Sequence, residues 1–363
     1  DVIIGTLSTG REQLLQIAAA VGTGAKVIVM DEPSSSLSAA ETAELFRLVR
    51  ELKSRGITLI YVSHRMEELF ALCDNITVLR DGKHVATERI PDTTPHRVVT
   101  QMIGRELLIA TPNHIARPLG DERLRTEGLS SPRKFSGIDL SVRAGEIVGI
   151  AGIVGAGRSE VVEAIFGLDP AATGRVTVKG SALALGSRDA ALAAGLGLVP
   201  EDRKRQGLVL GLNNRENTSL AALPSLTTLG WVKRATERDL AERHTRRLRV
   251  KAPSLETITA GLSGGNQQKI ALAKWLARSC DVLLIDEPTR GVDVGAKAEI
   301  YQLLDELACE GKALLVVSSE LPELIGLCRR IIVMRNGGIA GEVQRADFSE
   351  AALMRLMAGV AAA

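Results

Sequence analysis

The chain has 363 residues, of which 45% are hydrophobic and 24% are charged, and its formal net charge is +2. This composition is typical of a globular protein with a hydrophobic core, and the charge is too small to imply nucleic-acid binding. No uninterrupted apolar stretch reaches the roughly 18 residues that a membrane-spanning helix needs. The four cysteines form no C-x-x-C pair and the five histidines show no ligand spacing, so neither a zinc site nor a redox motif is supported.

The first hundred residues alternate between predicted helices and short apolar strands. We expect helices at Gln13–Val21 and Ala40–Arg55, the second ending at Gly56, a residue type that commonly ends helices. Apolar strands are expected at Lys26–Met30 and Ile57–Val62. Continuous apolar strands that alternate with helices are typical of a parallel sheet covered on both faces.

A segment with neither helical nor strand periodicity, residues 104–125, follows and contains Pro112 and Pro118. We expect it to be a linker. The polar stretch Arg215–Arg249 is rich in helix formers and is predicted to be a helical insertion. After the linker the pattern of strands and helices restarts, with a strand at Glu146–Ala151, a turn at Gly152–Arg158, a helix at Ser159–Phe166, and strands at Val176–Lys179, Leu196–Val199, Leu283–Asp286 and Ala313–Val317.

The chain contains an internal repeat with a constant offset of 255 residues. The repeat relates Leu7–Gly10 to Leu262–Gly265, and it relates His64 to Ser319. A fixed offset without insertions indicates two copies of one structural unit. We therefore expect residues 1–103 to be the C-terminal part of a first domain, residues 104–125 to be a linker, and residues 126–363 to be a complete second domain.

Residues 152–159, with the sequence GIVGAGRS, fit the spacing G-x4-G-K-[ST] except that Arg158 replaces the lysine. Such a loop directs backbone N–H groups at phosphate oxygens and leads into a helix N-terminus, and the Ser159 hydroxyl can hold Mg²⁺. The alternative is an ordinary glycine-rich turn. By the repeat, the partner loop would fall about 100 residues before Asp1. The nucleotide contacts expected from this loop are Gly152, Ile153, Val154, Gly155, Ala156, Gly157, Arg158 and Ser159.

Two apolar strands each end in a pair of acids, Asp31-Glu32 and Asp286-Glu287. The first acid of each pair, Asp31 or Asp286, suits a hold on Mg²⁺. The second, Glu32 or Glu287, suits polarising an attacking water molecule. Either pair alone could instead cap the helix that starts at the following proline. Because the pairs recur at the repeat offset, the catalytic interpretation is favoured.

The sequence LSGGNQQK at Leu262–Lys269 is predicted to open a helix with a serine cap followed by two glycines. The unpaired N–H groups of such a helix end can bind a phosphate, although a capped helix without a ligand is the alternative. The residues expected to contact a nucleotide are Ser263, Gly264, Gly265 and Gln267, with Ser8, Thr9 and Gly10 in the first copy.

LSGGNQQK and LLIDEPTRGVD together resemble the signature motif, Walker B motif and D-loop of the ATP-binding cassette (ABC) ATPases. The resemblance implies an α/β P-loop NTPase fold with a mostly parallel sheet core, a helical subdomain and a small antiparallel β element. It also implies ATP and Mg²⁺ as cofactors, His64 as the switch histidine with Ser319 in its place in the second copy, and Glu201 at the Q-loop position. In that family two domains face head to tail, and each ATP lies between one domain's phosphate loop and the other's signature motif.

GIVGAGRSE, VPEDRKRQGLVLGLNNRENTSL and DEPTRGVDVGAKAEIYQLL narrow the resemblance to the fused double-cassette ATPases of bacterial importers for ribose, xylose, galactose and arabinose. This implies tandem cassettes truncated at the N-terminus and a position at the cytoplasmic face of the inner membrane. The implied partners are membrane permease subunits and, indirectly, a periplasmic or lipid-anchored sugar-binding protein, without nucleic acid. Three alternatives remain: a nucleoside or autoinducer importer ATPase, a soluble cassette ATPase acting on ribosomes or DNA, and a nucleotide-binding module without turnover.

Departures from a full set of hydrolytic residues gather on one of the two sites that the resemblance implies. Arg158, Glu201 and Ser319 belong to the second copy, and Thr9 stands in the first copy's signature where glycine is usual. The planar fork of arginine does not reproduce the compact charge of lysine, and serine lacks the ring nitrogen of His64. We therefore expect one hydrolytic and one degenerate site, and weak or no hydrolysis by this chain alone. Neutral drift, with both sites turning over, is the alternative.

Overall fold

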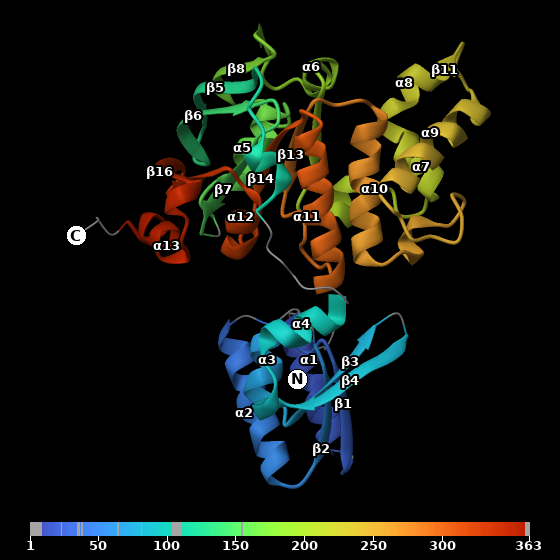
Figure 1. Ribbon diagram of the computed structural model, residues 1–363, viewed down its shortest axis with the longest axis vertical. Coiled ribbons are helices and arrows are strands. Elements are labelled where there is room, and N and C mark those ends of the chain that lie inside the picture. The colour runs from blue at the N-terminus through green and yellow to red at the C-terminus, as the bar shows by residue number, and fades with distance from the viewer. Residues whose placement is uncertain are drawn as a thin grey trace, which may run out of the picture. The chain divides into compact units, whose positions relative to one another are not determined.

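The computed structural model describes residues 9–22, 24–34, 37, 39–63, 65–80, 82–103, 111–153 and 155–359. The chain divides into two compact units, Asp1–Leu108 and Ile109–Ala363, and each is described by itself (Figure 1). Of the expected site residues, Ser8, His64 and Val154 lie outside the described residues, and for Thr9 and Gly10 only the backbone is described.

The first unit contains a two-stranded parallel sheet, a β-hairpin and the helices between them. The helices and strands that we expected in this region are confirmed within a few residues. The elements are α1 (Thr9–Gly22), β1 (Val27–Asp31), α2 (Ala39–Ser54), β2 (Thr58–Val62), α3 (Met66–Leu72), β3 (Asn75–Arg80), β4 (Lys83–Arg89), the 3₁₀ turn η2 (Ile90–Asp92) and α4 (Pro95–Ile103).

The second unit begins with a 3₁₀ turn, η3 (Asn113–Ala116), that lies within the expected linker. The structure packs this turn on the second unit: the backbone N–H and Nδ1 of buried His114 lie 2.9 and 2.8 Å from Asp305 Oδ1, and Arg329 donates to the carbonyl of His114. Hydrogen bonds between side chains and backbone hold this segment, so its order does not require the apolar periodicity of a helix or strand. An antiparallel sheet in the order β6-β5-β8-β9 follows, comprising β5 (Glu122–Ser131), β6 (Phe135–Arg143), β8 (Thr173–Val178) and β9 (Ser181–Ala182).

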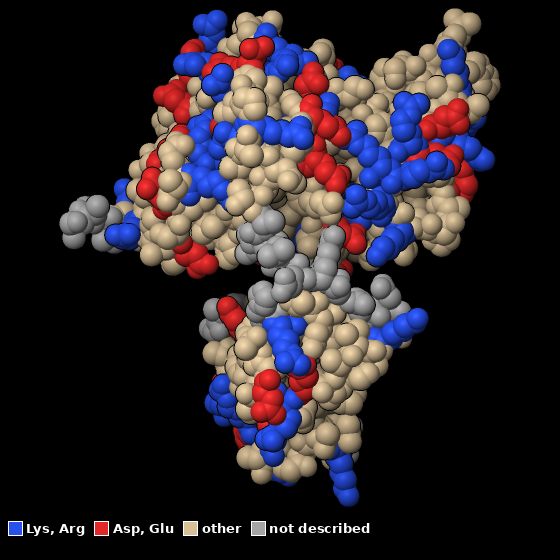
Figure 2. All heavy atoms as spheres, viewed as in Figure 1, with Lys and Arg blue, Asp and Glu red and all other residues tan. Residues whose placement is uncertain are grey.

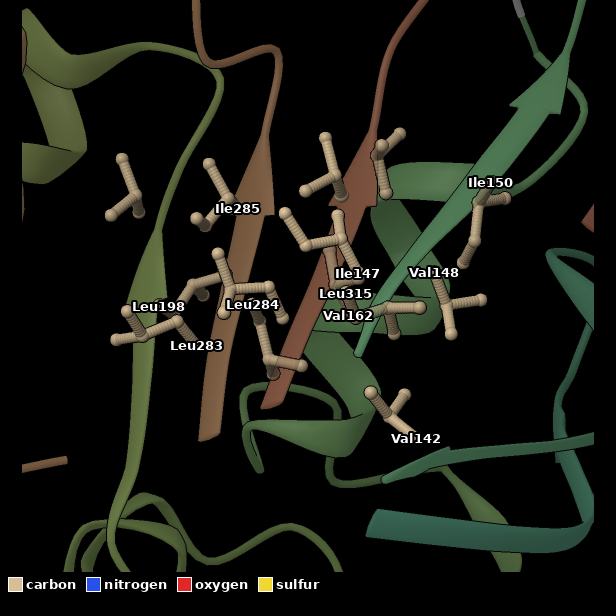
Figure 3. Close-up of a cluster of buried hydrophobic side chains, with 14 of the residues drawn as sticks. Val142, Ile147, Val148, Ile150, Val162, Leu198, Leu283, Leu284, Ile285 and Leu315 are labelled. Atoms are coloured by element: carbon tan, nitrogen blue, oxygen red, sulfur yellow. The ribbon is translucent and has the colours of Figure 1, made fainter. Parts of the chain in front are cut away.

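The centre of the second unit is a six-stranded sheet in the order β10-β13-β14-β7-β15-β16, parallel except for the β15–β16 pair. Every residue of β7, β10, β13 and β14 is buried, which requires cover on both faces of the sheet. Figure 3 shows side chains of these four strands in one cluster, with Val162 of α5 against it. The strands are β7 (Ile147–Gly152), β10 (Leu196–Val199), β13 (Val282–Asp286), β14 (Ala313–Val317), β15 (Arg330–Arg335) and β16 (Gly338–Gln344).

The expected insertion is helical but also contains a small hairpin of β11 (Thr227–Thr228) and β12 (Trp231–Val232). Leu229 and Gly230 at its turn have φ angles of 51° and 83°, as a two-residue hairpin turn requires. No described helix is long and apolar enough to span a bilayer. The helices and helical turns of this unit are α5 (Arg158–Ile165), α6 (Arg188–Ala193), η4 (Arg203–Gly207), α7 (Asn214–Ser219), η5 (Leu220–Ala222), α8 (Leu223–Leu226), α9 (Arg234–Arg247), η6 (Thr259–Gly261), α10 (Gly264–Ala277), α11 (Val294–Cys309), α12 (Leu321–Leu327), η7 (Arg345–Asp347) and α13 (Glu350–Ala358).

The sequence repeat is also a structural repeat. All nine described elements of the first unit, from α1 to α4, recur between α10 and α13 with both of their bounds shifted by 255 residues. The register recurs too, because Val27 pairs with Thr58 in one unit and Val282 pairs with Ala313 in the other. Even the irregularity between Val78 and Leu79 has its counterpart between the equivalent residues of β15.

The two units differ in what covers these strands. In the first unit, Val27, Val29, Ile60 and Val62 of β1 and β2 are 46–64% exposed. Their counterparts in β13 and β14 are 0% exposed, because they lie in a buried cluster that also contains residues of β7, α5 and β10. The first unit therefore corresponds to residues 264–358 of the second unit. Its described residues contain no counterparts of β7, α5 and β10.

Candidate nucleotide-binding site

The strand-loop-helix context expected of the phosphate loop is present in the second unit. β7 ends at Gly152 and α5 begins at Arg158. A Cβ atom at Gly152 would lie 2.8 Å from the Met334 carbonyl oxygen, and one at Gly157, where φ is 91°, would lie 2.9 Å from the Lys134 carbonyl oxygen. Both positions therefore require glycine, and the tight turn places the start of α5 directly after the strand end.

Arg158 does not extend freely into this loop. Its side chain is 9% exposed, Nη1 donates to the Ser318 carbonyl oxygen at 2.7 Å, and Nη2 lies 3.7 Å from Glu287 Oε1. The long planar fork of arginine can reach both acceptors at once. The guanidinium that we expected to meet phosphate oxygens thus contacts the ends of β13 and β14 in this structure.

Both carboxylate oxygens of Glu287 have protein partners. Ser319 donates its backbone N–H to Oε1 at 2.8 Å and its hydroxyl to Oε2 at 3.1 Å. Burial raises the pKa of Glu287, and the Ser319 hydrogen bonds and Arg158 oppose this effect. The Glu287 backbone has a φ of 48°, and its N–H donates to the Val317 carbonyl.

Glu32 has the same backbone geometry in the first unit, with a φ of 47° and a hydrogen bond from its N–H to the Val62 carbonyl at 2.9 Å. A positive φ at a non-glycine residue is uncommon and often marks a functional position. Its recurrence at two equivalent glutamates supports a role for these residues beyond helix capping.

Asp286 provides a position that fits a divalent cation. The residue is 3% exposed, and its Oδ1 atom is buried without a hydrogen-bond partner among the described residues. Burial raises the pKa of Asp286 to about 6, while a hydrogen bond from Ser159 favours the charged form. A carboxylate oxygen beside a hydroxyl is the kind of donor set that Mg²⁺ binds.

Ser159 and Asp286 line one cavity of about 530 Å³ together with Glu201. Glu201 at the expected Q-loop position forms an ion pair with Arg290. The structure thus brings together three predicted residues that are separated by more than 40 residues in the sequence. Asp31, the counterpart of Asp286, ends β1 in the first unit.

The glycines of the LSGG sequence are required by packing. Ser263 precedes α10 and accepts a hydrogen bond from Asn266 at 2.9 Å. A Cβ atom at Gly264 would lie 2.5 Å from the Gly291 carbonyl oxygen, and one at Gly265 would lie 2.5 Å from Ala296 Cβ. Close packing alone therefore excludes larger residues at both positions.

Gln267 differs from our expectation of a nucleotide contact. It is 4% exposed, and its side-chain amide donates to the Thr259 carbonyl oxygen at 3.2 Å. The side chain is turned into the protein because position 267 lies on the buried face of α10, where it fixes the preceding 3₁₀ turn.

The sequence analysis missed a buried glutamate that links the two strand ends. Glu323 in α12 is 3% exposed and accepts hydrogen bonds from Thr289, at 3.0 Å, and from the hydroxyl of Ser318. Burial raises the pKa of Glu323 to about 7. Its bonds connect the turn after β13 with the turn after β14. Ser319, which follows Ser318, is the residue that donates to Glu287.

Glu68 makes the same bridge in the first unit, with Ser34 at 2.5 Å and Ser63 at 3.2 Å. Tyr61 and Arg65 also donate to Glu68, at 2.8 and 3.3 Å. The counterparts of these two donors are Val316 and Glu320. The sequence signal that could have revealed the pair is an acid four residues after His64 and after Ser319.

Known proteins resemble this chain in sequence. The ABC transporter family profile matches residues 135–290. A ribose import ATP-binding protein of Bacillus licheniformis is 46% identical over 355 residues, covering 98% of this chain and 72% of the relative. An arabinose import ATP-binding protein of Rhizobium etli is 46% identical over 353 residues, covering 97% and 70%.

Solved structures show the same fold. A nucleotide-free ATP-binding cassette from an ABC transporter superposes with a TM-score of 0.55 at 21% identity, covering 65% of this chain and 98% of that one. A cassette in a dimeric post-hydrolysis state bound to ADP and Pi gives a TM-score of 0.54 at 23% identity, covering 62% and 100%. With its P-loop context, its cassette fold and its close relatives, the chain belongs to the ABC ATPase family, as an ATP-binding protein of ABC transporters.

Proposed function

We propose that this chain is the ATP-hydrolysing energy-coupling subunit of a bacterial importer for monosaccharides of the ribose and arabinose type. Relatives that match it over nearly its whole length include ribose, arabinose and putative ribose/galactose import ATP-binding proteins. The observation that carries the proposal is the cavity where Ser159, Asp286 and Glu201 meet beside the glycine loop. ATP would bind at that loop, and Ser159 and Asp286 would hold Mg²⁺.

The chain contains two related cassettes in this proposal. Residues 1–103 form the C-terminal part of a first nucleotide-binding domain, and residues 126–363 belong to a complete second one. The expected linker, residues 104–125, already contains η3 and the start of β5, which pack with this second unit. Nine elements that recur at one offset support this division. The exposed apolar face of β1 and β2 supports it too, since the equivalent face in the second unit is fully covered.

The two sites are proposed to be unequal. Glu32 with His64 would serve hydrolysis, while the site that uses the second unit's phosphate loop would mainly retain nucleotide. The contacts that Ser319 and Arg158 make with Glu287 support this assignment, because they occupy the carboxylate that would otherwise polarise a water molecule.

The helical insertion and the segment around Glu201 are proposed to contact permease subunits at the cytoplasmic face of the membrane, with a sugar-binding protein acting through them. The hairpin of the insertion supports a protein contact, since Leu229 is 96% exposed and Trp231 is 79% exposed. Large exposed aromatic residues are enriched at binding hot spots. Figure 2 shows basic side chains gathered around α9, interleaved with acidic ones.

Uptake of radiolabelled D-ribose and L-arabinose tests the sugar assignment. The gene is expressed with its neighbouring permease and binding-protein genes in cells without their own importers. We expect uptake of at least one of the two sugars. We also expect ATP binding by the Asp286→Asn variant to depend less on Mg²⁺ than ATP binding by wild type does. In the purified chain, ATP binding with little phosphate release would agree with the unequal sites. No uptake of either sugar by the complete set would contradict the proposal.

A further inference from the structure

Arg203 is a buried cation without an acidic partner. The residue is 8% exposed, and no carboxylate of the described chain lies within ion-pair distance of its guanidinium. Its Nη1 donates to the Arg290 carbonyl oxygen at 2.6 Å and its Nη2 to the Gly291 carbonyl oxygen at 3.1 Å, while Nε has no partner among the described residues. Burial lowers the pKa of Arg203, and neighbouring Asp202 opposes this effect. Because an unpaired buried charge is costly, a functional reason for it is expected.

The position of Arg203 connects three parts of the site. It begins η4, two residues after Glu201, and it lines the cavity that contains Ser159 and Asp286. Its two acceptors lie in the segment after β13. A Cβ atom at Gly264, the first residue of α10, would lie 2.8 Å from Arg203 Nη2 and 2.5 Å from the Gly291 carbonyl oxygen. The guanidinium and the start of α10 are therefore packed against the same carbonyl group.

A second buried cation holds the other end of η4. Lys274 in α10 is 8% exposed and donates to the Gly207 carbonyl oxygen at 2.7 Å. It too has no carboxylate within ion-pair distance among the residues described. Cations thus hold both ends of η4: Arg203 donates to the segment after β13, and Lys274 of α10 donates to Gly207.

We propose that Arg203 is a positioning residue that couples the Glu201–Gln206 segment to the start of α10 through the Arg290 and Gly291 carbonyls. This rests on the proposed function, in which that segment receives the permease contact. A displacement of η4 would move the guanidinium, and with it the carbonyls against which Gly264 packs. The signature sequence would then respond to the permease without touching it.

Hydrogen exchange of the purified chain tests this coupling. In Arg203→Met, peptides covering residues 263–268 and 289–293 should exchange about tenfold faster, since two charge-assisted hydrogen bonds are lost. The matched control is Lys204→Met, which removes an exposed cation from the same turn and should change exchange less than about twofold.

The second variant, Arg203→Ala, is measured with and without millimolar guanidinium chloride, with urea at equal concentration for comparison. Guanidinium, which restores the missing cation, should slow exchange in the two segments, and neutral urea should not. Unchanged exchange in both segments of Arg203→Met, or acceleration spread evenly over the second unit, would overturn the proposal. These measurements need no sugar or permease, so failure of the transport assay leaves them decisive.

Discussion

At the residue scale, Ser319 occupies the position that the repeat makes equivalent to His64. Its N–H and hydroxyl both donate to Glu287, and Arg158 forms an ion pair with the same carboxylate. A hydroxyl so placed holds the acid in one orientation, whereas an imidazole nitrogen could be offered to a phosphate. Behind this contact, Glu323 fixes Ser318 from within the protein.

The raised pKa of Glu323 predicts a specific pH dependence of stability. Burial raises its pKa to about 7 in the folded chain, from an ordinary value of 4.5. The folded state therefore binds more protons than the unfolded state between these values, so the stabilisation is present at low pH and is lost as pH rises. Relative to Glu323→Gln, the free energy of unfolding of wild type should fall by about 1–3 kcal/mol between about pH 5 and about pH 8.

Urea unfolding of both proteins across this range measures the difference. Glu320→Gln serves as the control, because Glu320 is ion-paired with Lys297 on the surface and does not join the two strand ends. Parallel stability profiles for wild type and Glu323→Gln would contradict the assignment.

At the element scale, the packing of α10 on its neighbours sets the shape of the signature region. The glycines of LSGG suggested a phosphate-binding helix end, and the structure shows a steric reason for them as well. Both reasons apply to the same two glycines, which pack against Gly291 and Ala296 while the preceding Ser263 is exposed.

Gly265→Ala should destabilise the second unit by about 1–3 kcal/mol, because the new Cβ would overlap with Ala296. Urea unfolding followed by circular dichroism gives the free-energy difference. Gly211→Ala is the control, since a Cβ there meets nothing within 4 Å. The double variant Gly265→Ala/Ala296→Gly should recover part of the lost stability. A Gly265→Ala protein as stable as the control would show that the helix start can shift at little cost.

At the scale of the whole molecule, one set of nine elements is used in two surroundings. In the second unit β7 and β10 flank β13 and β14 in the sheet, and Asp286 at the end of β13 lines a cavity. In the first unit the same strands carry Glu32 and an exposed apolar face. Equivalent acids in different surroundings need not have equal roles.

Glu32→Gln in the complete transporter should therefore abolish sugar uptake, while Glu287→Gln should retain a large part of it. Replacing a general base commonly lowers the rate about 10²- to 10⁴-fold, which would bring uptake to background. Initial uptake rates of D-ribose or L-arabinose, normalised to the amount of each ATPase in the membrane, provide the comparison. Equal loss in the two variants would reject unequal sites.

Most of the fold could be predicted from the sequence, because the local hydrophobic pattern and the repeat both consist of residue types at fixed spacing along the chain. The apolar strands ending in Asp31 and Asp286 were correctly located, since a fully buried parallel strand needs a continuous apolar run. The turn at 113–117 was not, because its order depends on Asp305 and Arg329, which lie about 200 residues away in the sequence.

The sequence by itself determined the motifs, the offset between the copies and the family, since each depends on residue type at fixed spacing. The tertiary structure alone decided which of these side chains are free to act. It turned Gln267 inward, joined Arg158 and Ser319 to Glu287, and placed a lone guanidinium against the carbonyls after β13. The physical reason is that burial and hydrogen-bond partners come from packing between distant segments, and no local pattern in the chain records them.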